Sequence, residues 1–281
     1  MTDIPNLDEL IRMALREDIG DGDHSTLACI PPTATDCAKM VAKQDGVICG
    51  CEVGREVFTI VDPSLKITLM KKDGDVVSKG DVIMLVEGHS GSILTAERTA
   101  LNFMQRLSGI ATETHRMVKM LDGLNTRLLD TRKTTPNMRL LEKYAVHCGG
   151  GTNHRIGLYD MIMLKDNHVD FAGGIEAAID RTHDYLHSKG KNLKIEIEVR
   201  NLDELDRVLA HGGVDRIMLD NFDVATLKEA VRRIDGRYET EASGGITDQT
   251  LRSYAETGVD FISVGALTHH IKSLDISLVK K

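Results

Sequence analysis

The fold is decided by residues 195–220, which read IEIEVRNLDELDRVLAHGGVDRIMLD. Two short apolar runs, ending at Val199 and Asp220, flank an amphipathic segment over 202–211 with the length and period of a helix. Asn201 followed by Glu204 forms a capping pair that predicts where this helix begins. A strand, a helix and a second strand of these lengths make up the repeating unit of a parallel α/β sheet.

The same unit recurs through the second half of the chain. Strands are expected to end at Thr131, Lys165, Val199, Asp220, Ser243 and Gly265. The helices between them are expected over 138–148, 175–187, 202–211, 224–234 and 248–256. An incomplete (β/α) barrel of six to eight strands is our first interpretation of this pattern, and a doubly wound sheet is the second.

The first part of the chain has a different organisation. Asn6 is expected to cap a helix that stops at the GDGD run over 20–23. Short alternating runs with glycines between them predict β hairpins over 39–87. A helix is expected from Thr95, interrupted at Gly109, and a second helix over 113–121. We therefore predict a β-rich domain over 1–112 and the barrel over 113–269.

The composition argues against several classes of protein. A net charge of −8 and a pI near 5.8 disfavour a nucleic-acid-binding protein, and no run of about 18 apolar residues could span a membrane. The first 17 residues carry early acidic groups, unlike a secretory signal, so we expect a cytoplasmic protein. An odd number of cysteines, five, disfavours a disulfide framework.

Charged residues and glycines follow nearly every expected strand. They are Asp130–Lys133, Lys165–His168, Glu198, Asp220–Asn221, Ser243–Gly245 and Gly265. In a parallel α/β fold the carboxyl ends of the strands meet at one rim, where ligands bind. The cations are concentrated over 127–165 of an otherwise acidic chain, which suits the capture of a small anion.

Several of these residue types point to anionic substrates. Arg132, Lys133, Arg155 and Lys165 would repel one another in one cavity unless anions neutralised them, although each alone could be a solvated surface residue. The glycine turns at 243–245 and 265 can cradle a phosphate with backbone amides. Glu196 and Glu198 share one face of their strand: in a barrel Glu198 could reach ribose hydroxyls or Mg²⁺, whereas an edge strand would leave both solvated.

Longer runs of the chain resemble one family. They are DTRKTTP over 130–136, GGGTNHR over 149–155 and KDNH over 165–168, with ERTALN over 97–102, LDNF over 219–222, SGGI over 243–246 and VGALTH over 264–269. These runs are similar to quinolinate phosphoribosyltransferase over nearly the whole chain. One departure is Asn137, where many relatives carry glycine, and we expect only a local change of the turn there.

The resemblance implies a reaction in NAD biosynthesis. Quinolinate and phosphoribosyl pyrophosphate, with Mg²⁺, would give nicotinate mononucleotide, pyrophosphate and carbon dioxide. It also implies an N-terminal α/β sandwich and a homodimer in which the sandwich of one subunit covers the barrel of its neighbour, with a hexamer as a further option. The tail over 270–281 is expected to pack back on the sandwich.

The resemblance also assigns site residues by motif position. Arg98 would reach the site of the neighbouring subunit. The pocket for the dicarboxylate and pyrophosphate would be lined by Arg132, Lys133, Thr134, His154, Arg155 and Lys165. Glu198 and Asp220 would serve the ribose hydroxyls and Mg²⁺. The 5′-phosphate would lie at Ser243, Gly244, Gly245 and Gly265, with His269 as a further substrate-binding residue. Of these, Lys133, Lys165, Glu198 and Asp220 are the predicted catalytic residues.

Three other functions share parts of the pattern. A related pyrophosphorylase could act on a different base, but the cations exceed what one monocarboxylate needs. The β pattern over 71–87 is similar to that of a carrier module, yet it has no Met-flanked lysine at its tip. A barrel lyase or isomerase would use Lys165 as a Schiff base.

Overall fold

The computed structural model describes residues 4–281, which form two compact units. The first contains the chain up to His115 together with Thr134–Gly150 and Leu267–Lys281. The second contains Arg116–Lys133 and Gly151–Ala266. The predicted domains over 1–112 and 113–269 are single segments, whereas these units combine segments far apart in the chain. Residues 1–3 of the first predicted domain lie outside the described residues.

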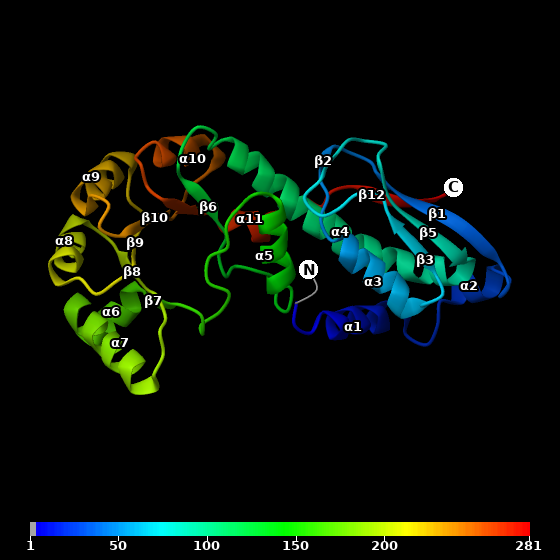
Figure 1. The fold of residues 1–281 in the computed structure, drawn as a ribbon, viewed down its shortest axis with the longest axis horizontal. Helices are drawn as coiled ribbons and strands as arrows, with labels where there is room; N and C mark the ends of the chain where they lie inside the picture. Colours follow the sequence, from blue (N-terminus) through cyan, green and yellow to red (C-terminus); the bar gives the residue numbers. More distant parts are fainter. Residues whose placement is uncertain (1–3) are drawn as a thin grey trace. The chain divides into compact units, whose positions relative to one another are not determined.

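The first unit is built on a four-stranded antiparallel sheet in the order β12-β1-β5-β3 (Figure 1). The strands are β1 (Thr35–Ala42), β3 (Lys66–Leu69), β5 (Val82–His89) and β12 (Ile276–Lys280). β12 comes from the C-terminal tail and pairs with β1, so that Met40 lies opposite Leu278. Two further short strands, β2 (Gly46–Val47) and β4 (Val76–Val77), pair with each other.

The helices of the first part of the chain differ in several places from the prediction. They are α1 (Leu7–Ile19), α2 (His24–Cys29), α3 (Cys51–Val61), α4 (Ser90–Lys119) and α5 (Arg139–Cys148). α3 was missed because its 11 residues lie between strands; its buried Val53, Val57 and Phe58 nevertheless have helical spacing. Asn6 precedes α1 with a left-handed backbone and no side-chain cap, so the predicted capping bond is wrong.

The predicted break at Gly109 is also wrong, because α4 runs without interruption over 30 residues. A β carbon at Gly109 would collide with the carbonyl oxygen of Lys272 and lie 3.0 Å from the Cα of Ser273. The glycine therefore allows the tail to pass close to the helix. Glycine has a low helix propensity, but at position 109 it is needed for packing. The flanking apolar residues keep the helix intact.

The second unit is a curved parallel sheet of six strands in the order β6-β11-β10-β9-β8-β7. The strands are β6 (Arg127–Leu129), β7 (Ile162–Leu164), β8 (Ile195–Val199), β9 (Arg216–Asp220), β10 (Glu239–Ser243) and β11 (Phe261–Ser263). The helices are α6 (Asp166–Ala172), α7 (Ile175–Lys189), α8 (Leu202–His211), α9 (Val224–Ile234), α10 (Asp248–Ala255) and the short α11 (Ala266–His269), which ends in the first unit.

This topology confirms the incomplete barrel. From β7 to β11 each strand lies beside the next one in the chain, and α7 to α10 lie outside the curve (Figure 1). A doubly wound sheet would reverse its strand order and carry helices on both faces. β6 closes against β11, and its other edge is extended by a parallel bridge from Leu129 to Thr152. No pairing joins β6 to β7 among the residues described, so the ring stays open.

Two expectations about the whole chain can also be compared with the structure. All five cysteines are free thiols, as their odd number suggested. Within the described residues, no helix has both the length and the apolar surface needed to cross a bilayer.

The close approach at Gly109 gives a stability prediction. Gly109→Ala should lower the free energy of unfolding by about 1–3 kcal/mol, because the methyl group meets backbone atoms that cannot rotate away. Gly91→Ala in the same helix is the control, since its β carbon meets only the Thr26 side chain at 3.2 Å. Urea unfolding measures both variants. Equal effects of the two substitutions would show that the contact with the tail is not tight.

Candidate active site

The carboxyl ends of the barrel strands carry most of the predicted site residues. Lys165 follows β7, Glu198 lies near the end of β8, Asp220 ends β9 and Ser243 ends β10. β8 lies between β7 and β9, and Glu196 and Glu198 are buried, so the solvated edge strand considered from the sequence is wrong. Alternation along β8 turns both carboxylates into the barrel.

A lysine and two carboxylates meet at the ends of β7, β8 and β9. The Nζ of Lys165 lies 3.0 Å from Oε2 of Glu198. Burial raises the pKa of Asp220, while a hydrogen bond from Asn221 and the charges of Lys165 and Lys133 act against this shift. Four predicted catalytic residues are therefore close enough to influence one another electrostatically.

The structure also shows how Lys165 is positioned. Its backbone N–H donates to Nδ1 of His168 at 3.0 Å, which closes the first turn of α6. The His168 side chain thereby holds the chain where the lysine leaves the strand. The KDNH motif thus combines a functional lysine with the residue that fixes its backbone.

The turns after β9 and β10 approach each other closely. The backbone N–H of Asn221 donates to the carbonyl of Ser243 at 2.8 Å, and its Nδ2 donates to Asp220 at 2.6 Å. Gly244 has a φ of 96°, and any β carbon there would collide with the Asn221 side chain. Only glycine therefore fits beside Asn221, and the exposed Gly245 follows with a φ of 62°. Gly265, the other predicted phosphate residue, follows β11.

Two guanidinium groups, those of Arg132 and Arg155, lie near each other. Burial lowers the pKa of Arg155, and the charge of Arg132 is the next largest cause. Nη1 of Arg155 donates to the carbonyl of Met161 at 3.2 Å. Like charges held together in a half-buried place are a suitable receptor for a carboxylate or phosphate.

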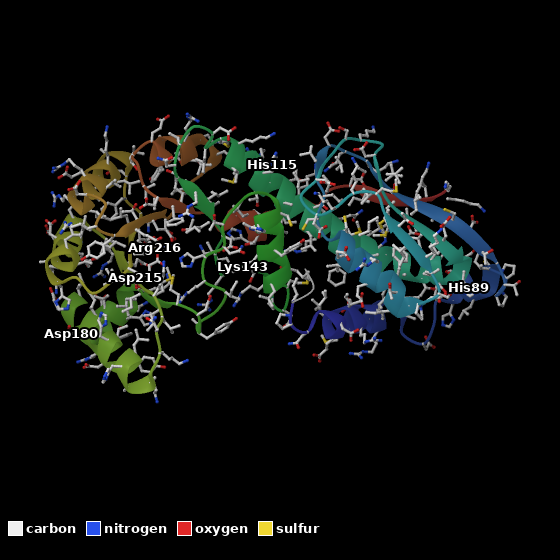
Figure 2. All side chains as sticks on the ribbon, viewed as in Figure 1. His89, His115, Lys143, Asp180, Asp215 and Arg216 are labelled. Carbon is white, nitrogen blue, oxygen red and sulfur yellow. The ribbon has the colours of Figure 1, made fainter. Side chains whose placement is uncertain are left out.

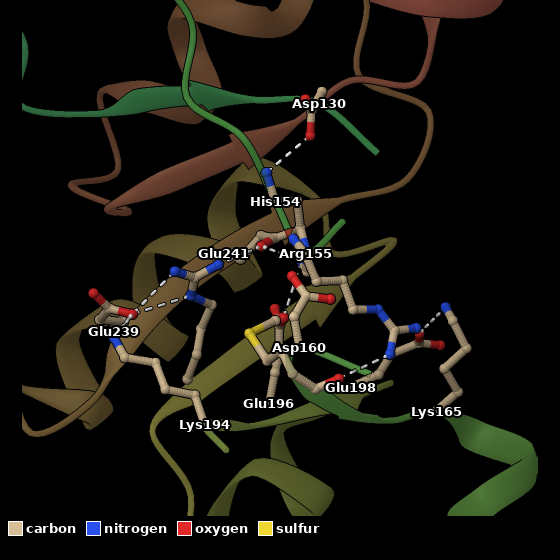
Figure 3. Close-up of polar contacts among 12 residues, drawn as sticks. Asp130, His154, Arg155, Asp160, Lys165, Lys194, Glu196, Glu198, Glu239 and Glu241 are labelled. Carbon is tan, nitrogen blue, oxygen red and sulfur yellow. Dashed lines mark hydrogen bonds and ion pairs between the residues drawn. The ribbon is translucent and has the colours of Figure 1, made fainter. Parts of the chain in front are cut away.

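A buried ionic cluster beneath the rim was not recognised in the sequence (Figure 3). Nε2 of His154 lies 3.0 Å from Glu196 and 3.3 Å from Glu241. All three side chains are buried, and the two carboxylates are fully enclosed. The alternation IEIEV on β8 and ETEAS on β10 was the available signal, because in a barrel every second residue points inward.

The cluster continues to Arg216, which lies on β9 inside the barrel (Figure 2). Its guanidinium contacts Glu241 at 3.3 Å and Glu239 at 3.0 Å. It also stacks over Phe261 with 4.2 Å between the guanidinium carbon and the ring centroid. Burial alone would raise the pKa of Glu241, but His154 and Arg216 hold it below its usual value.

The protonation of His154 is set by opposing contacts. Against the penalty of burial, Glu196 and Glu241 act to raise the pKa of His154. The backbone N–H of Arg155, however, donates to Nδ1 of the same ring at 2.7 Å. A ring proton on Nδ1 would face that N–H group, so this contact opposes the doubly protonated ring and leaves a single proton on Nε2, toward the carboxylates.

Three predicted residues belong to the first unit. Arg98 is an exposed residue of α4, Thr134 begins the segment before α5, and His269 is exposed at the end of α11. Arg139 of α5 donates to the Thr134 hydroxyl at 3.1 Å. Asn137, the departure noted in the sequence, has a φ of 63°, a backbone that glycine also adopts readily. The turn thus keeps its left-handed geometry without glycine.

A parallel α/β barrel that brings cations, carboxylates and glycine turns to its carboxyl rim defines a class of enzymes that act on small anionic substrates. The model of the C-terminal domain of quinolinate phosphoribosyl transferase matches residues 110–279, and that of the N-terminal domain matches residues 23–108. The chain belongs to the quinolinate phosphoribosyltransferase family, and it is therefore a decarboxylating phosphoribosyltransferase of NAD biosynthesis.

Named relatives agree over nearly the whole chain. The chloroplastic carboxylating nicotinate-nucleotide pyrophosphorylase of Arabidopsis thaliana is 46% identical over 97% of this chain and 82% of its own length. A probable carboxylating enzyme of the same name from Bacillus subtilis is 42% identical over 97% and 92%. The solved nicotinate-nucleotide pyrophosphorylase of Francisella tularensis superposes with a TM-score of 0.94 at 42% identity, covering 99% of this chain and 98% of that one.

The raised pKa of Asp220 predicts that this predicted catalytic residue lowers the stability of the fold when it is charged. In the folded protein the charged form is disfavoured, so stability falls as the pH rises through the folded pKa. Asp220→Asn should therefore raise the Tm at pH 8 by on the order of 2 °C, and the gain should shrink toward pH 4.

Asp223→Asn is the matched control for this prediction. Hydrogen bonds from Thr226 lower the pKa of Asp223, so its charge stabilises the fold and the effect should have the opposite sign. Thermal unfolding across the pH range measures both variants. A gain in the Asp220→Asn variant that does not change with pH would show that burial of charge is not its cause.

Proposed function

We propose that the rim of the barrel transfers the phosphoribosyl group of phosphoribosyl pyrophosphate to quinolinate, with loss of carbon dioxide. The observation that carries this assignment is the pair of guanidinium groups, Arg132 and Arg155, near the Lys165–Glu198 contact. This combination offers forked donors for a dicarboxylate beside carboxylates for a ribose. Lys133 is assigned to the same site as Lys165 because both charges act on Asp220.

The chemistry of the transfer fits these residues. Displacement of pyrophosphate from the anomeric carbon develops positive charge on the sugar and negative charge on the leaving group. Lys133 and Lys165 stabilise the leaving group, while Glu198 and Asp220 hold the ribose hydroxyls and lie near the cationic ring. Arg132 and Arg155 orient quinolinate so that its ring nitrogen faces the anomeric carbon. The reaction needs no covalent nucleophile from the protein.

The 5′-phosphate is assigned to the glycine turns. The close approach of Asn221 and Gly244 leaves backbone amides of Ser243, Gly244 and Gly245 at the end of β10, and Gly265 adds those after β11. His269 and Thr134, which belong to the first unit, remain predicted substrate-binding residues. These roles keep the ribose between the carboxylates and the phosphate cradle.

Mg²⁺ fits the oxygen donors at the rim. Glu198 and Asp220 lie at the ends of neighbouring strands, and one or two carboxylates with substrate phosphates are the usual ligands of this ion. The chemistry supplied by Mg²⁺ when bound is neutralisation of charge on the pyrophosphate oxygens. Asp220, whose charge is disfavoured by burial, gains most from a nearby cation.

We also propose an oligomeric state and a cellular location for this enzyme. Arg98 is exposed on α4, and we assign it to the site of a second subunit in a homodimer with shared active sites. Hexamers would be assemblies of such dimers. We also propose a cytoplasmic location. Neither nucleic acid nor membrane is part of the proposed function.

A Schiff-base lyase is the second candidate for this barrel. It would require Lys165 as a neutral amine, since only that form attacks a carbonyl group. Its Nζ instead lies 3.0 Å from the Glu198 carboxylate, in an ion pair that engages the amine. The geometry therefore supports an electrostatic role of Lys165 over a covalent one.

The proposed reaction can be tested with the purified protein. Quinolinate consumption should release carbon dioxide and pyrophosphate in equal amounts, should require phosphoribosyl pyrophosphate, and should stop when EDTA removes Mg²⁺. Nicotinate should not replace quinolinate, because two forked cations exceed what one carboxylate needs. Equal turnover of nicotinate would contradict the dicarboxylate assignment.

Shared sites predict complementation between two inactive variants. Arg98→Ala and Lys133→Ala should each reduce activity at least a hundredfold alone. In randomly exchanged dimers about a quarter of the sites would carry both native residues, so activity should return to about 25% of the native level. Arg55→Ala, which removes a surface contact with Glu52 in the same helix, serves as the mixing control. Absence of rescue after confirmed exchange would place Arg98 outside the neighbour's site.

A further inference from the structure

His154 is assigned by the family resemblance to the substrate pocket, but its surroundings indicate a different task. The ring is 8% exposed. Nε2 faces Glu196 and Glu241, at 3.0 and 3.3 Å, and Nδ1 accepts the backbone N–H of Arg155 at 2.7 Å. Both ring nitrogens thus have protein partners, and the second partner is the residue that carries a substrate-binding guanidinium.

The backbone around His154 is held from a second direction as well. Its own N–H donates to Oδ1 of Asp130 at 2.8 Å, and Nδ2 of Asn153 donates to Oδ2 of the same carboxylate at 2.6 Å. Asp130 is fully buried directly after β6. The segment that delivers Arg155 to the rim is therefore fastened to β6 through Asp130 and to β8 and β10 through the His154 ring.

Arg216 forms the far end of this support. It contacts Glu241 at 3.3 Å and is itself fixed by Glu239 and by the ring of Phe261. An Arg–Glu–His chain therefore runs from Arg216 through Glu241 and His154 and ends at the Arg155 backbone. Such buried polar chains orient their terminal group because each member is fixed by the next.

A bound metal ion is the competing explanation of the same cluster. The nitrogen of His154 and the carboxylate oxygens of Glu196 and Glu241 lie within 4.8 Å of one another. A divalent ion there would have to share Glu241 with the Arg216 guanidinium, and two positive groups at that distance repel strongly in a buried place.

We propose that His154 is a positioning residue, held by Glu196 and Glu241 with its proton on Nε2 so that Nδ1 fixes the backbone of Arg155, and that Glu241 on Arg216 anchors this support. The role of Arg155 in binding the substrate rests on the proposed function. The state of the His154 ring does not depend on it. The two parts can therefore fail separately.

The kinetic test compares Glu241→Gln with Glu239→Gln. Both carboxylates contact Arg216, but only Glu241 contacts His154, so the second variant is a matched control. Glu241→Gln should raise the KM for quinolinate on the order of tenfold with kcat changed less than about twofold, because misplacing Arg155 weakens ground-state and transition-state binding alike. Glu239→Gln should leave both parameters near native values. Equal effects of the two variants, or a loss confined to kcat, would overturn the role of Glu241.

The spectroscopic test uses the native enzyme, so it holds even where a variant folds poorly. Long-range ¹H–¹⁵N correlation of histidine-labelled protein, with His154 assigned through His154→Asn, should show a neutral ring protonated on Nε2. A doubly protonated ring or a proton on Nδ1 would overturn the proposal. After dialysis against EDTA, a divalent ion retained by the native protein and lost in Glu241→Gln would overturn it in favour of a metal site.

An inactive native enzyme would contradict the proposed function instead. If quinolinate is not consumed by the native protein, the proposed function is wrong. The protonation state of the His154 ring still tests its positioning role in that case. If quinolinate is consumed but the ring is charged, the function stands and the positioning role of His154 is wrong.

Discussion

The structure depends on the balance of buried charge inside the barrel. Glu196 and Glu241 are fully enclosed, and an enclosed carboxylate is costly unless a cation or hydrogen-bond donor compensates it. Arg216 and His154 supply that compensation from β9 and from the segment after β6. Removal of one partner from such a pair typically costs about 3–5 kcal/mol, far more than a surface contact. The interior charges therefore fix which side chains face each other across the ring.

The incomplete ring gives this interior its polar character. A closed barrel of eight strands fills its centre with branched apolar side chains in layers. Here the six strands do not close into a full ring, and the interior combines the Arg216 guanidinium, the carboxylates of Glu196 and Glu241 and the aromatic ring of Phe261. Glu198, Asp220 and Ser243 lie nearer the carboxyl ends of their strands, at the rim. Charge thus extends from the substrate end of the barrel deep into its core.

Activity and stability place opposite demands on the rim. Arg132 and Arg155 lie near each other, and burial disfavours the charge of Asp220. Each arrangement costs free energy in the absence of substrate, because like charges repel each other and a buried charge loses hydration. Anionic substrates and a cation would relieve these costs when they bind. The unfavourable electrostatics of the rim are thus part of the binding energy.

The sequence by itself determined the repeating strand–helix unit, the rim residues and the family. The period of the apolar residues and the charges at strand ends are local signals, so helices such as α8 and α9 were predicted at the observed residues. The long runs over 130–136 and 149–155 were specific enough to identify the family. Gly109 and α3 were misjudged because local propensity says nothing about the tail or strands that pack against them.

Only the tertiary structure decided what lies inside the barrel. Glu196, Glu241, Arg216 and His154 stand on three strands and one loop, far apart in the chain, and no local pattern states that they meet. Alternation shows which face a side chain takes, but the sheet order and its curvature choose the partners on that face. The task of His154 therefore follows from packing, since the same residue in the same motif could have faced either the substrate or the core.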